Sequence, residues 1–319
     1  MFYIDTEPCE GSRAAALSEP RSRARLASPG ARRRRRKLHG YLFMAPALTT
    51  YLLFVAIPWV HTVSLSFYRW DGVGPGTWAG LANYRQVFDD PQLTGAIEHS
   101  LEFIVFYAVV PIVIGLLLAA VLAGRKIRGA AAAQAILFLP QVVPLVASGI
   151  AWRWMYAQSG VVNQALSAVG LGSITRAWLG DFTWAFPAVG LVGSWVMLGL
   201  CLAFFLTGIA KIDSSLYEAA RIDGAGAVRE FFAVTFPSLR QEIAVALTIS
   251  VIAALSSFDV VFATTGGGPG TSTIVPAVLI YRLAFTDGQV GTACALAIVL
   301  SALISVIVLG INRLSKERP

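Results

Sequence analysis

Long apolar stretches alternate with short polar segments along most of the chain, and each stretch carries few or no charges. A helix needs about 20 apolar residues to cross a bilayer, so each stretch is long enough for one span. The pattern predicts an all-α, polytopic membrane protein with six transmembrane helices. We place them at about residues 41–66, 102–124, 130–155, 184–210, 242–263 and 290–312.

Composition supports this class of protein. The chain has 319 residues, of which 56% are hydrophobic and 13% are charged, whereas a soluble domain carries about 25% charged residues. A chain in water cannot hide so much apolar surface. Residues 1–38 differ, because they are rich in Ser, Ala, Pro and Arg and cannot form a core. We therefore expect a basic disordered tail at 1–38 and a transmembrane domain at 39–319.

Basic residues are unevenly divided between the polar segments. Most of the net charge of +7 comes from the tail, which contains the run Arg32–Lys37. Lys and Arg also follow the second, fourth and sixth spans, whereas the opposite segments hold few. By the positive-inside rule, both termini and the segment after span four are cytoplasmic. The tail thus indicates orientation in the membrane, and we expect no nucleic-acid partner.

The longest charge-bearing segment between two apolar stretches, residues 214–237, predicts a helical hairpin. Ser215 and Glu218 have the spacing of a capping box, which would start the first helix. Gly224 and Gly226 can adopt the left-handed conformation that ends a helix. The second helix carries four apolar residues at helical spacing and then a proline that ends it: Val228, Phe231, Phe232, Phe236 and Pro237. Such a hairpin outside the bilayer offers a rigid surface to another protein.

The sequence contains no catalytic or cofactor-binding constellation that we can identify. His39, His61 and His99 are too far apart for local metal-ligand spacing, and the three cysteines are scattered. A glycine-rich turn on the outer side lacks the Lys-Ser/Thr of a phosphate-binding loop. It consists of Gly266, Gly267, Gly268 and Pro269. We therefore expect a protein that is not an enzyme and needs no cofactor or metal.

Prolines inside the spans have two interpretations. They lie in spans one to four, at Pro46, Pro58, Pro111, Pro140, Pro144 and Pro187. A proline in a span frees a backbone carbonyl, which a neighbouring helix or water in a cavity must satisfy. The prolines are therefore either ordinary kinks or marks of a solvent-lined path that opens by helix bending.

Asp259 interrupts the fifth apolar stretch. It lies about 24 Å along a helix that starts at Ile243, which is short of a hydrocarbon core about 30 Å thick. Three neighbours would add hydroxyls and an aromatic ring for a polyhydroxylated solute: Ser256, Ser257 and Phe258. Alternatively, Asp259 is a helix-end carboxylate that pairs with an arginine such as Arg153 or Arg282.

The hairpin resembles the EAA loop of permease subunits of binding-protein-dependent ABC importers. The matching residues are Glu218-Ala219-Ala220, Gly224 and Val234-Thr235-Phe236-Pro237. The family pattern prefers Ile and Leu where this chain has Val234 and Phe236. Other segments of the chain resemble the sugar-uptake branch of this family, which is of the maltose and glycerol-phosphate type. They are Pro140, Pro144, Trp152-Arg153-Trp154, Phe258-Asp259, the glycine-rich turn and Ile280-Tyr281-Arg282.

The resemblance implies the partners and the site. It implies a separate cytoplasmic ATPase subunit, docked on Glu218, Ala219, Ala220, Asp223, Gly224 and Pro237. It also implies a second permease subunit, generally a different one, an extracytoplasmic solute-binding protein, and a sugar or oligosaccharide carried across a prokaryotic cell membrane. The alternative at this site is that Glu218 only caps its helix and the hairpin is an ordinary amphipathic loop.

Two other classes of protein stay open. An ion-coupled secondary transporter of a polar solute would use Asp259 as its ion site. The scarcity of carboxylates in the spans and the lack of a second, inverted set of spans weigh against it. A scaffold without a transport path is the third class.

Overall fold

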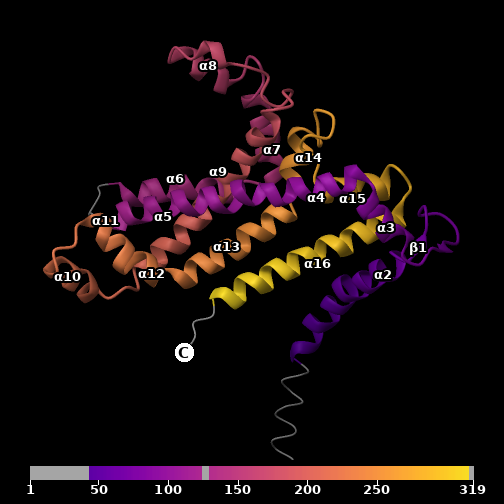
Figure 1. Ribbon diagram of the computed structural model, residues 1–319, viewed down its shortest axis with the longest axis horizontal. Coiled ribbons are helices and arrows are strands. Elements are labelled where there is room, and N and C mark those ends of the chain that lie inside the picture. Colours follow the sequence, from indigo (N-terminus) through magenta and orange to yellow (C-terminus); the bar gives the residue numbers. More distant parts are fainter. Residues whose placement is uncertain (1–42, 124–128, 316–319) are drawn as a thin grey trace, which may run out of the picture. The chain divides into compact units, whose positions relative to one another are not determined.

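The computed structural model describes residues 43–123 and 129–315 (Figure 1). The predicted basic tail at 1–38 lies outside the described residues. The chain divides into two units, Met1–Ile57 and Pro58–Pro319. In the described part, four helices are long and apolar enough to cross a membrane, and up to six spans result if each of two bent helix pairs is one span. The pairs are Ala131–Val142 with Leu145–Met155, and Ala227–Ser238 with Arg240–Leu255. The prediction of a mostly helical, polytopic membrane protein is confirmed.

The first span is a helix from Phe43 to Leu65. It contains a π-helical segment, η1 (Leu52–Ala56), and ends with α2 (Ile57–Leu65). Neither segment contains a buried residue, although most of their side chains are apolar. Such a surface is stable only against lipid or another chain.

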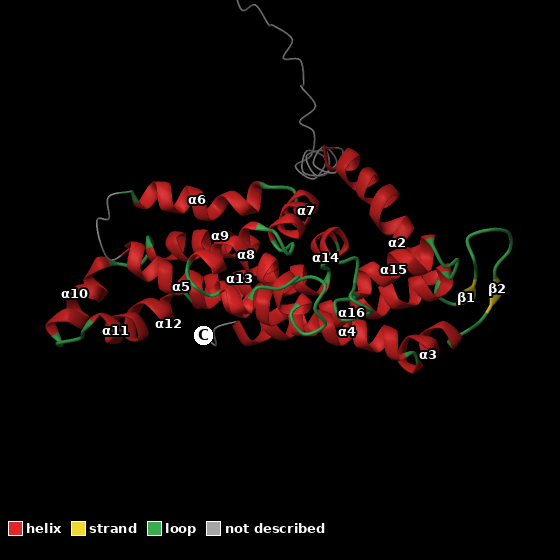
Figure 2. Cartoon of the chain, turned by 90° about the horizontal axis from the view of Figure 1, so that it is seen from above, coloured by secondary structure: helices red, strands yellow, loops and turns green. Residues whose placement is uncertain are grey.

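The second unit is a helical bundle with one small sheet (Figure 2). Strands β1 (Tyr68–Arg69) and β2 (Thr77–Trp78) pair antiparallel, with Tyr68 opposite Trp78. The next helices are α3 (Ala82–Asp89), α4 (Pro91–Ile104), η2 (Val105–Val109) and α5 (Val110–Ala123). They are followed by α6 (Ala130–Val142), α7 (Leu145–Met155), α8 (Val161–Ala168), η3 (Gly172–Ile174) and α9 (Ala185–Ile209). The last are α10 (Ser214–Ile222), α11 (Ala227–Glu230), η4 (Phe231–Thr235), α12 (Phe236–Ser238), α13 (Arg240–Leu255), α14 (Asp259–Thr264), α15 (Pro276–Phe285) and α16 (Val290–Ser315).

Helix α9 is the central helix of this bundle. More than half of its residues are buried, and α5 and α6 pack along it (Figure 1). Glycines at its interfaces let neighbouring helices come close, as is usual between membrane helices. A Cβ atom at Gly193 would collide with the ring of Tyr107, and one at Gly199 would collide with the backbone carbonyl of Leu137 in α6. The small residues therefore fix the spacing of the bundle.

Three of the prolines follow a π-helical segment at the same distance. Pro58 follows the end of η1 by two residues, and Pro111 and Pro237 follow the ends of η2 and η4 in the same way. A proline has no N–H, and its ring clashes with the carbonyl four residues earlier. A widened π turn before it relieves the clash without ending the helix. The second helix of the hairpin accordingly includes Pro237 and ends at Ser238, one residue later than predicted.

Two of the predicted spans are broken. The third is divided into α6 and α7, which meet at an angle of 102°. Pro144 is the N-cap of α7, and its extended backbone turns the chain. The fifth is broken where α13 ends at Leu255 and α14 begins at Asp259. Helices α7 and α14, the short halves of these two spans, pack against each other.

Candidate functional site

The hairpin at residues 214–237 begins at an N-cap that differs from the predicted one. The carboxylate of Asp213 accepts a hydrogen bond of 3.0 Å from the backbone N–H of Ser215, and Ser214 is the first residue of α10. The predicted capping box of Ser215 and Glu218 is therefore wrong. Asp213 precedes the first helical residue with an extended backbone, which is the geometry that a cap requires. The Glu218 side chain makes no hydrogen bond in the described part of the chain.

This cap predicts a pH dependence of the hairpin. The hydrogen bonds from Ser215 lower the pKa of the Asp213 carboxyl. Because the folded-state pKa is depressed, the cap stabilises α10 above the unfolded-state pKa of about 3.9 and is lost as the pH falls through the folded-state value. We expect the amide protection of α10 to fall there in hydrogen exchange on the full chain in lipid nanodiscs. Asparagine can cap the helix without titrating, so the fall in amide protection at low pH should disappear in the Asp213→Asn variant. If this variant showed the same fall, Asp213 would not be the titrating cap of α10.

The turn between the two helices is built on Gly224. This residue has a φ of 76° and ends α10 in the left-handed conformation, as predicted. The N–H of Gly224 donates to the carbonyl of Arg221, and the N–H of Ala225 donates to the carbonyl of Ala220, which together form a Schellman motif. Gly226 is instead the extended N-cap of α11. No atom lies within 4 Å of a Cβ built at either glycine, so the turn is open on its outer side.

Side chains join the two helices of the hairpin. The guanidinium of Arg221 donates two hydrogen bonds, of 3.0 and 3.2 Å, to the carboxylate of Glu230. The hydrogen bonds to Glu230 and its charge raise the pKa of the Arg221 guanidinium. The hydroxyls of Tyr217 and Thr235 lie 3.2 Å apart and form a second link. The hairpin is therefore a cross-linked unit rather than two independent helices.

The hairpin exposes both carboxylates and apolar side chains. Glu218, Ala219, Asp223 and Gly224 are exposed, and Ala220 is half-buried. Of the neighbouring rings Phe231 and Phe232, only Phe231 packs against the hydrophobic core. Phe232 is 63% exposed and Val228 is 73% exposed. Val228 and Phe232 are an i, i+4 pair on the exposed face, whereas Phe231 and Thr235 form the corresponding pair on the face that packs inward.

A groove of about 850 Å³ lies between the hairpin and the end of α5. Glu218 and Tyr217 line it on the hairpin side, and Ala120 and Val121 line it on the α5 side. Figure 2 shows the hairpin at one end of the second unit and the β1–β2 sheet at the other. The hairpin is thus an exposed, preformed surface at the end of the helical bundle.

The predicted solute-binding residues have different environments at the break after α13. Ser257 is buried, and its hydroxyl lies 3.1 Å from that of Tyr107. Ser256 is exposed and donates to the carbonyl of Ile252. Asp259 is partly exposed at the start of α14, and within the described residues it forms no ion pair with Arg153 or Arg282. The alternative of a helix-end ion pair therefore has no support in the structure.

The sequence did not indicate a stripe of four aromatic rings next to Asp259. It comprises Phe258, Phe262, Tyr281 and Phe285, and we call it the aromatic stripe. Adjacent ring centroids are 5.0 to 5.8 Å apart, and Phe285 is 80% exposed. The stripe joins α14 to α15, so only the tertiary structure brings it together. The i, i+4 spacing within each helix was the one signal in the sequence.

The glycine-rich turn at 266–270 connects these helices and packs inward. Thr273 donates to the carbonyl of Gly268, and its hydroxyl lies 2.7 Å from that of Thr265. Gly267 has a φ of 102°, and a Cβ there would collide with Ile274. Arg282 donates to the carbonyl of Gly266. The glycine-rich turn, with Gly266, Gly267, Gly268 and Pro269, thus holds α14 and α15 in place.

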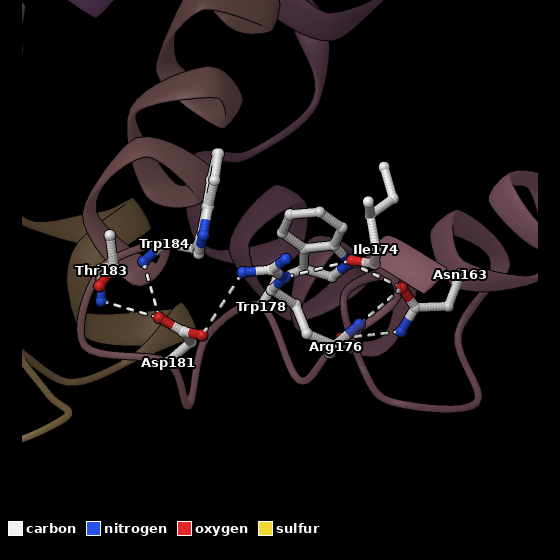
Figure 3. Close-up of polar contacts among 7 residues, drawn as sticks. All are labelled: Asn163, Ile174, Arg176, Trp178, Asp181, Thr183 and Trp184. Atoms are coloured by element: carbon white, nitrogen blue, oxygen red, sulfur yellow. Dashed lines mark hydrogen bonds and ion pairs between the residues drawn. The ribbon is translucent and has the colours of Figure 1, made fainter. Parts of the chain in front are cut away.

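A second loop segment, between α7 and α9, is ordered around Asn163 (Figure 3). Its amide nitrogen donates to three backbone carbonyls, and its oxygen accepts from the indole N–H of Trp178 at 2.8 Å. The Arg176 guanidinium lies over the rings of Trp178 and Trp184 and pairs with Asp181 at 3.7 Å. These contacts fix the fold of the loop.

The bundle and its hairpin together define a polytopic membrane protein with an exposed helical hairpin at one end. Residues 111–318 match the family of binding-protein-dependent transport system inner membrane components. The chain belongs to this family. It is 37% identical over 266 residues to the probable ABC transporter permease protein YurN of Bacillus subtilis. The match covers 82% of this chain and 91% of YurN.

One further relative and one solved structure are also similar to this chain over most of its length. The diacetylchitobiose uptake system permease protein NgcF of Streptomyces coelicolor is 33% identical over 310 residues, which is 91% of this chain and 88% of NgcF. The crystal structure of a bacterial ABC transporter involved in the import of the acidic polysaccharide alginate is similar with a TM-score of 0.74 and 26% identity. The match covers 88% of this chain and 96% of that chain.

Proposed function

We propose that this chain is the non-catalytic permease subunit of an ATP-driven importer that carries a carbohydrate into a prokaryotic cell. The observation that carries the proposal is the hairpin at 214–237, which is preformed, cross-linked and open at its turn. Family membership supports the transport role. The sugar-related names of NgcF and of the alginate transporter support a carbohydrate as the solute.

The hairpin is the surface on which a cytoplasmic ATPase subunit docks in this proposal. Glu218 supplies a free carboxylate for a basic group of the partner, and Gly224 leaves room for its backbone. Ala219, Ala220 and Asp223 line the same turn, and Pro237 sits in the second helix. Both termini and the hairpin lie on the cytoplasmic side, as the distribution of Lys and Arg predicts. A second, different permease subunit and an extracytoplasmic solute-binding protein complete the transporter.

The path for the solute runs along the aromatic stripe. Aromatic rings give apolar area to sugar rings, while a few polar groups fix their orientation. Ser256 and Asp259 supply polar groups beside Phe258, whereas Ser257 is turned toward Tyr107 and holds the break in place. The glycine-rich turn supports the stripe from the outer side. A neutral sugar suits this path better than an anion, because Asp259 is itself negative.

The experiment that tests the proposal is carbohydrate uptake by the complete transporter in proteoliposomes, with ATP and with an ionophore. We expect uptake that needs ATP and continues when the ionophore collapses the ion gradient. Asp259→Asn should keep ATP-dependent uptake within about tenfold of the original rate, because the amide keeps most of the hydrogen-bonding capacity of the side chain. Asp89→Asn, the same change at an exposed carboxylate at the end of α3 and outside the proposed path, serves as the control.

Ion-coupled transport would give the opposite results. Uptake would then collapse with the ionophore, continue without ATP and disappear in Asp259→Asn. A scaffold without a transport path would give no uptake under any of these conditions. The three classes of protein are thus separated by one set of measurements.

A further inference from the structure

A second concave site lies at the end of the bundle opposite the hairpin, where β1 and α3 meet the start of α16 (Figure 2). It is a groove of about 340 Å³, which we call the outer groove. Its volume is at the lower end of the range of small-molecule sites, about 300–1,000 Å³. The lining residues that matter here are Arg69, Trp70, Asp71, Gln86, Gln289 and Thr292.

The frame of the outer groove is rigid. The amide of Asn83 donates to the carbonyls of Ser66 and Tyr68, both at 2.8 Å, and so holds the chain that enters β1. A Cβ at Gly291 would collide with the carbonyl of Tyr68, so the first turn of α16 touches β1 directly. The N–H of Gly291 also donates to the carbonyl of Trp70. The groove is therefore preformed, which lowers the entropic cost of binding a ligand.

The polar groups in the groove suit a ligand that both donates and accepts hydrogen bonds. Gln86 donates to the side-chain oxygen of Gln289 at 3.2 Å and accepts from the hydroxyl of Thr292 at 3.1 Å. Each glutamine amide has two N–H groups and two lone pairs. The side-chain Nε2 of Gln289 donates to no atom of the described residues, and it is free to bind a ligand hydroxyl.

The charges in the groove balance. Arg69 and Asp71 both line it, one positive and one negative, and they form no ion pair with each other in the described structure. A net charge of zero, with amides and an indole ring between the two charges, favours a neutral polyhydroxylated ligand over an anion.

The outer groove is also close to the proposed path. Phe285, the last ring of the aromatic stripe, precedes the groove residue Gly288 by three positions. Their Cα atoms are therefore at most about 11 Å apart. We propose that the outer groove binds a ring of the incoming neutral saccharide before that ring reaches the aromatic stripe. This inference rests on the proposed import of a carbohydrate.

The test is a binding measurement on the full chain in lipid nanodiscs by isothermal titration. The probes are N,N′-diacetylchitobiose, lactose and maltose, with galacturonic acid as the anionic comparison. We expect at least one neutral probe to bind, and the double variant Gln86→Ala with Gln289→Ala to weaken its binding by about tenfold or more. Gln92→Ala, an exposed glutamine at the start of α4 outside the groove, should change the affinity less than about twofold.

The outcomes separate this inference from the proposed function. Binding of a neutral probe that the double variant leaves unchanged would overturn the inference, and so would binding of galacturonic acid alone. If the complete transporter takes up one of the neutral probes but the isolated chain binds none, the outer groove is not a saccharide site, although the importer function stands. Failure of carbohydrate uptake in the complete transporter would instead remove the proposed function.

Discussion

Glu218→Arg is expected to abolish ATP-driven uptake while the protein still inserts and folds. The side chain of Glu218 is exposed and makes no hydrogen bond in the described structure, so its loss costs the hairpin little. Reversing its charge opposes the basic group of an ATPase partner. Loss of a charge pair at an interface costs about 2–5 kcal/mol, which corresponds to a fall in uptake of more than about tenfold. Initial rates of uptake, normalised to the amount of protein in the membrane, measure this effect.

Two matched variants make the result interpretable. Asp89→Arg changes an exposed carboxylate at the end of α3 in the same way, far from the hairpin, and should leave uptake near the original rate. Co-purification of the ATPase subunit with the full chain should be weakened by Glu218→Arg and not by Asp89→Arg. Full transport by the Glu218→Arg protein would contradict the proposal that the ATPase subunit docks on the hairpin at Glu218. The hairpin would then be an ordinary amphipathic loop.

Gly199→Leu is expected to prevent correct packing of the bundle. A Cβ at Gly199 would collide with the carbonyl of Leu137 and would lie 2.8 Å from the Cα of Phe138, so the backbone of α6 would have to move. Overpacking lowers the stability of a folded protein by about 1–3 kcal/mol where side chains can adjust, and by more where the backbone itself has to move. We expect a large loss of monodisperse protein after extraction in detergent and a lower melting temperature in the protein that remains.

Gly310→Leu is the control for this variant. Gly310 is in α16 and is exposed, and a Cβ there has no atom within 4 Å. The same added volume should therefore be tolerated, with a yield close to that of the original protein. Equal losses in both variants would mean that leucine itself, rather than the α6–α9 contact, is responsible.

The sequence predicted the features that depend on local composition. Long apolar stretches gave the helical membrane class, because the bilayer requires about 20 apolar residues per span wherever the span packs. Gly224 was predicted to end α10, because few other residues adopt its backbone conformation without strain. The resemblance of the hairpin to the EAA loop gave the transporter family, which the match over residues 111–318 confirmed.

Other features of the chain required the tertiary structure. The cap of α10 is Asp213 rather than Ser215, because the extended backbone lies at Asp213 and the helix begins at Ser214. The 102° bend between α6 and α7 occurs inside an apolar stretch, where hydropathy gives no signal. Asp259 interrupted the fifth apolar stretch in the sequence, but only the structure shows that α13 ends before it, at Leu255. Phe232 is exposed because the second helix of the hairpin packs inward through Phe231, and local spacing does not decide which of the two rings is covered.

The candidate sites also differ in whether the sequence or only the tertiary structure reveals them. The hairpin is contiguous in sequence, so its residues could be recognised from their spacing. The aromatic stripe combines α14 with α15, and the outer groove joins Gln86 to Gln289, which are 203 positions apart. Local pattern determines which segments form helices and where they turn. The contacts between distant segments depend on how the helices pack, and these contacts decided where the aromatic stripe and the outer groove lie.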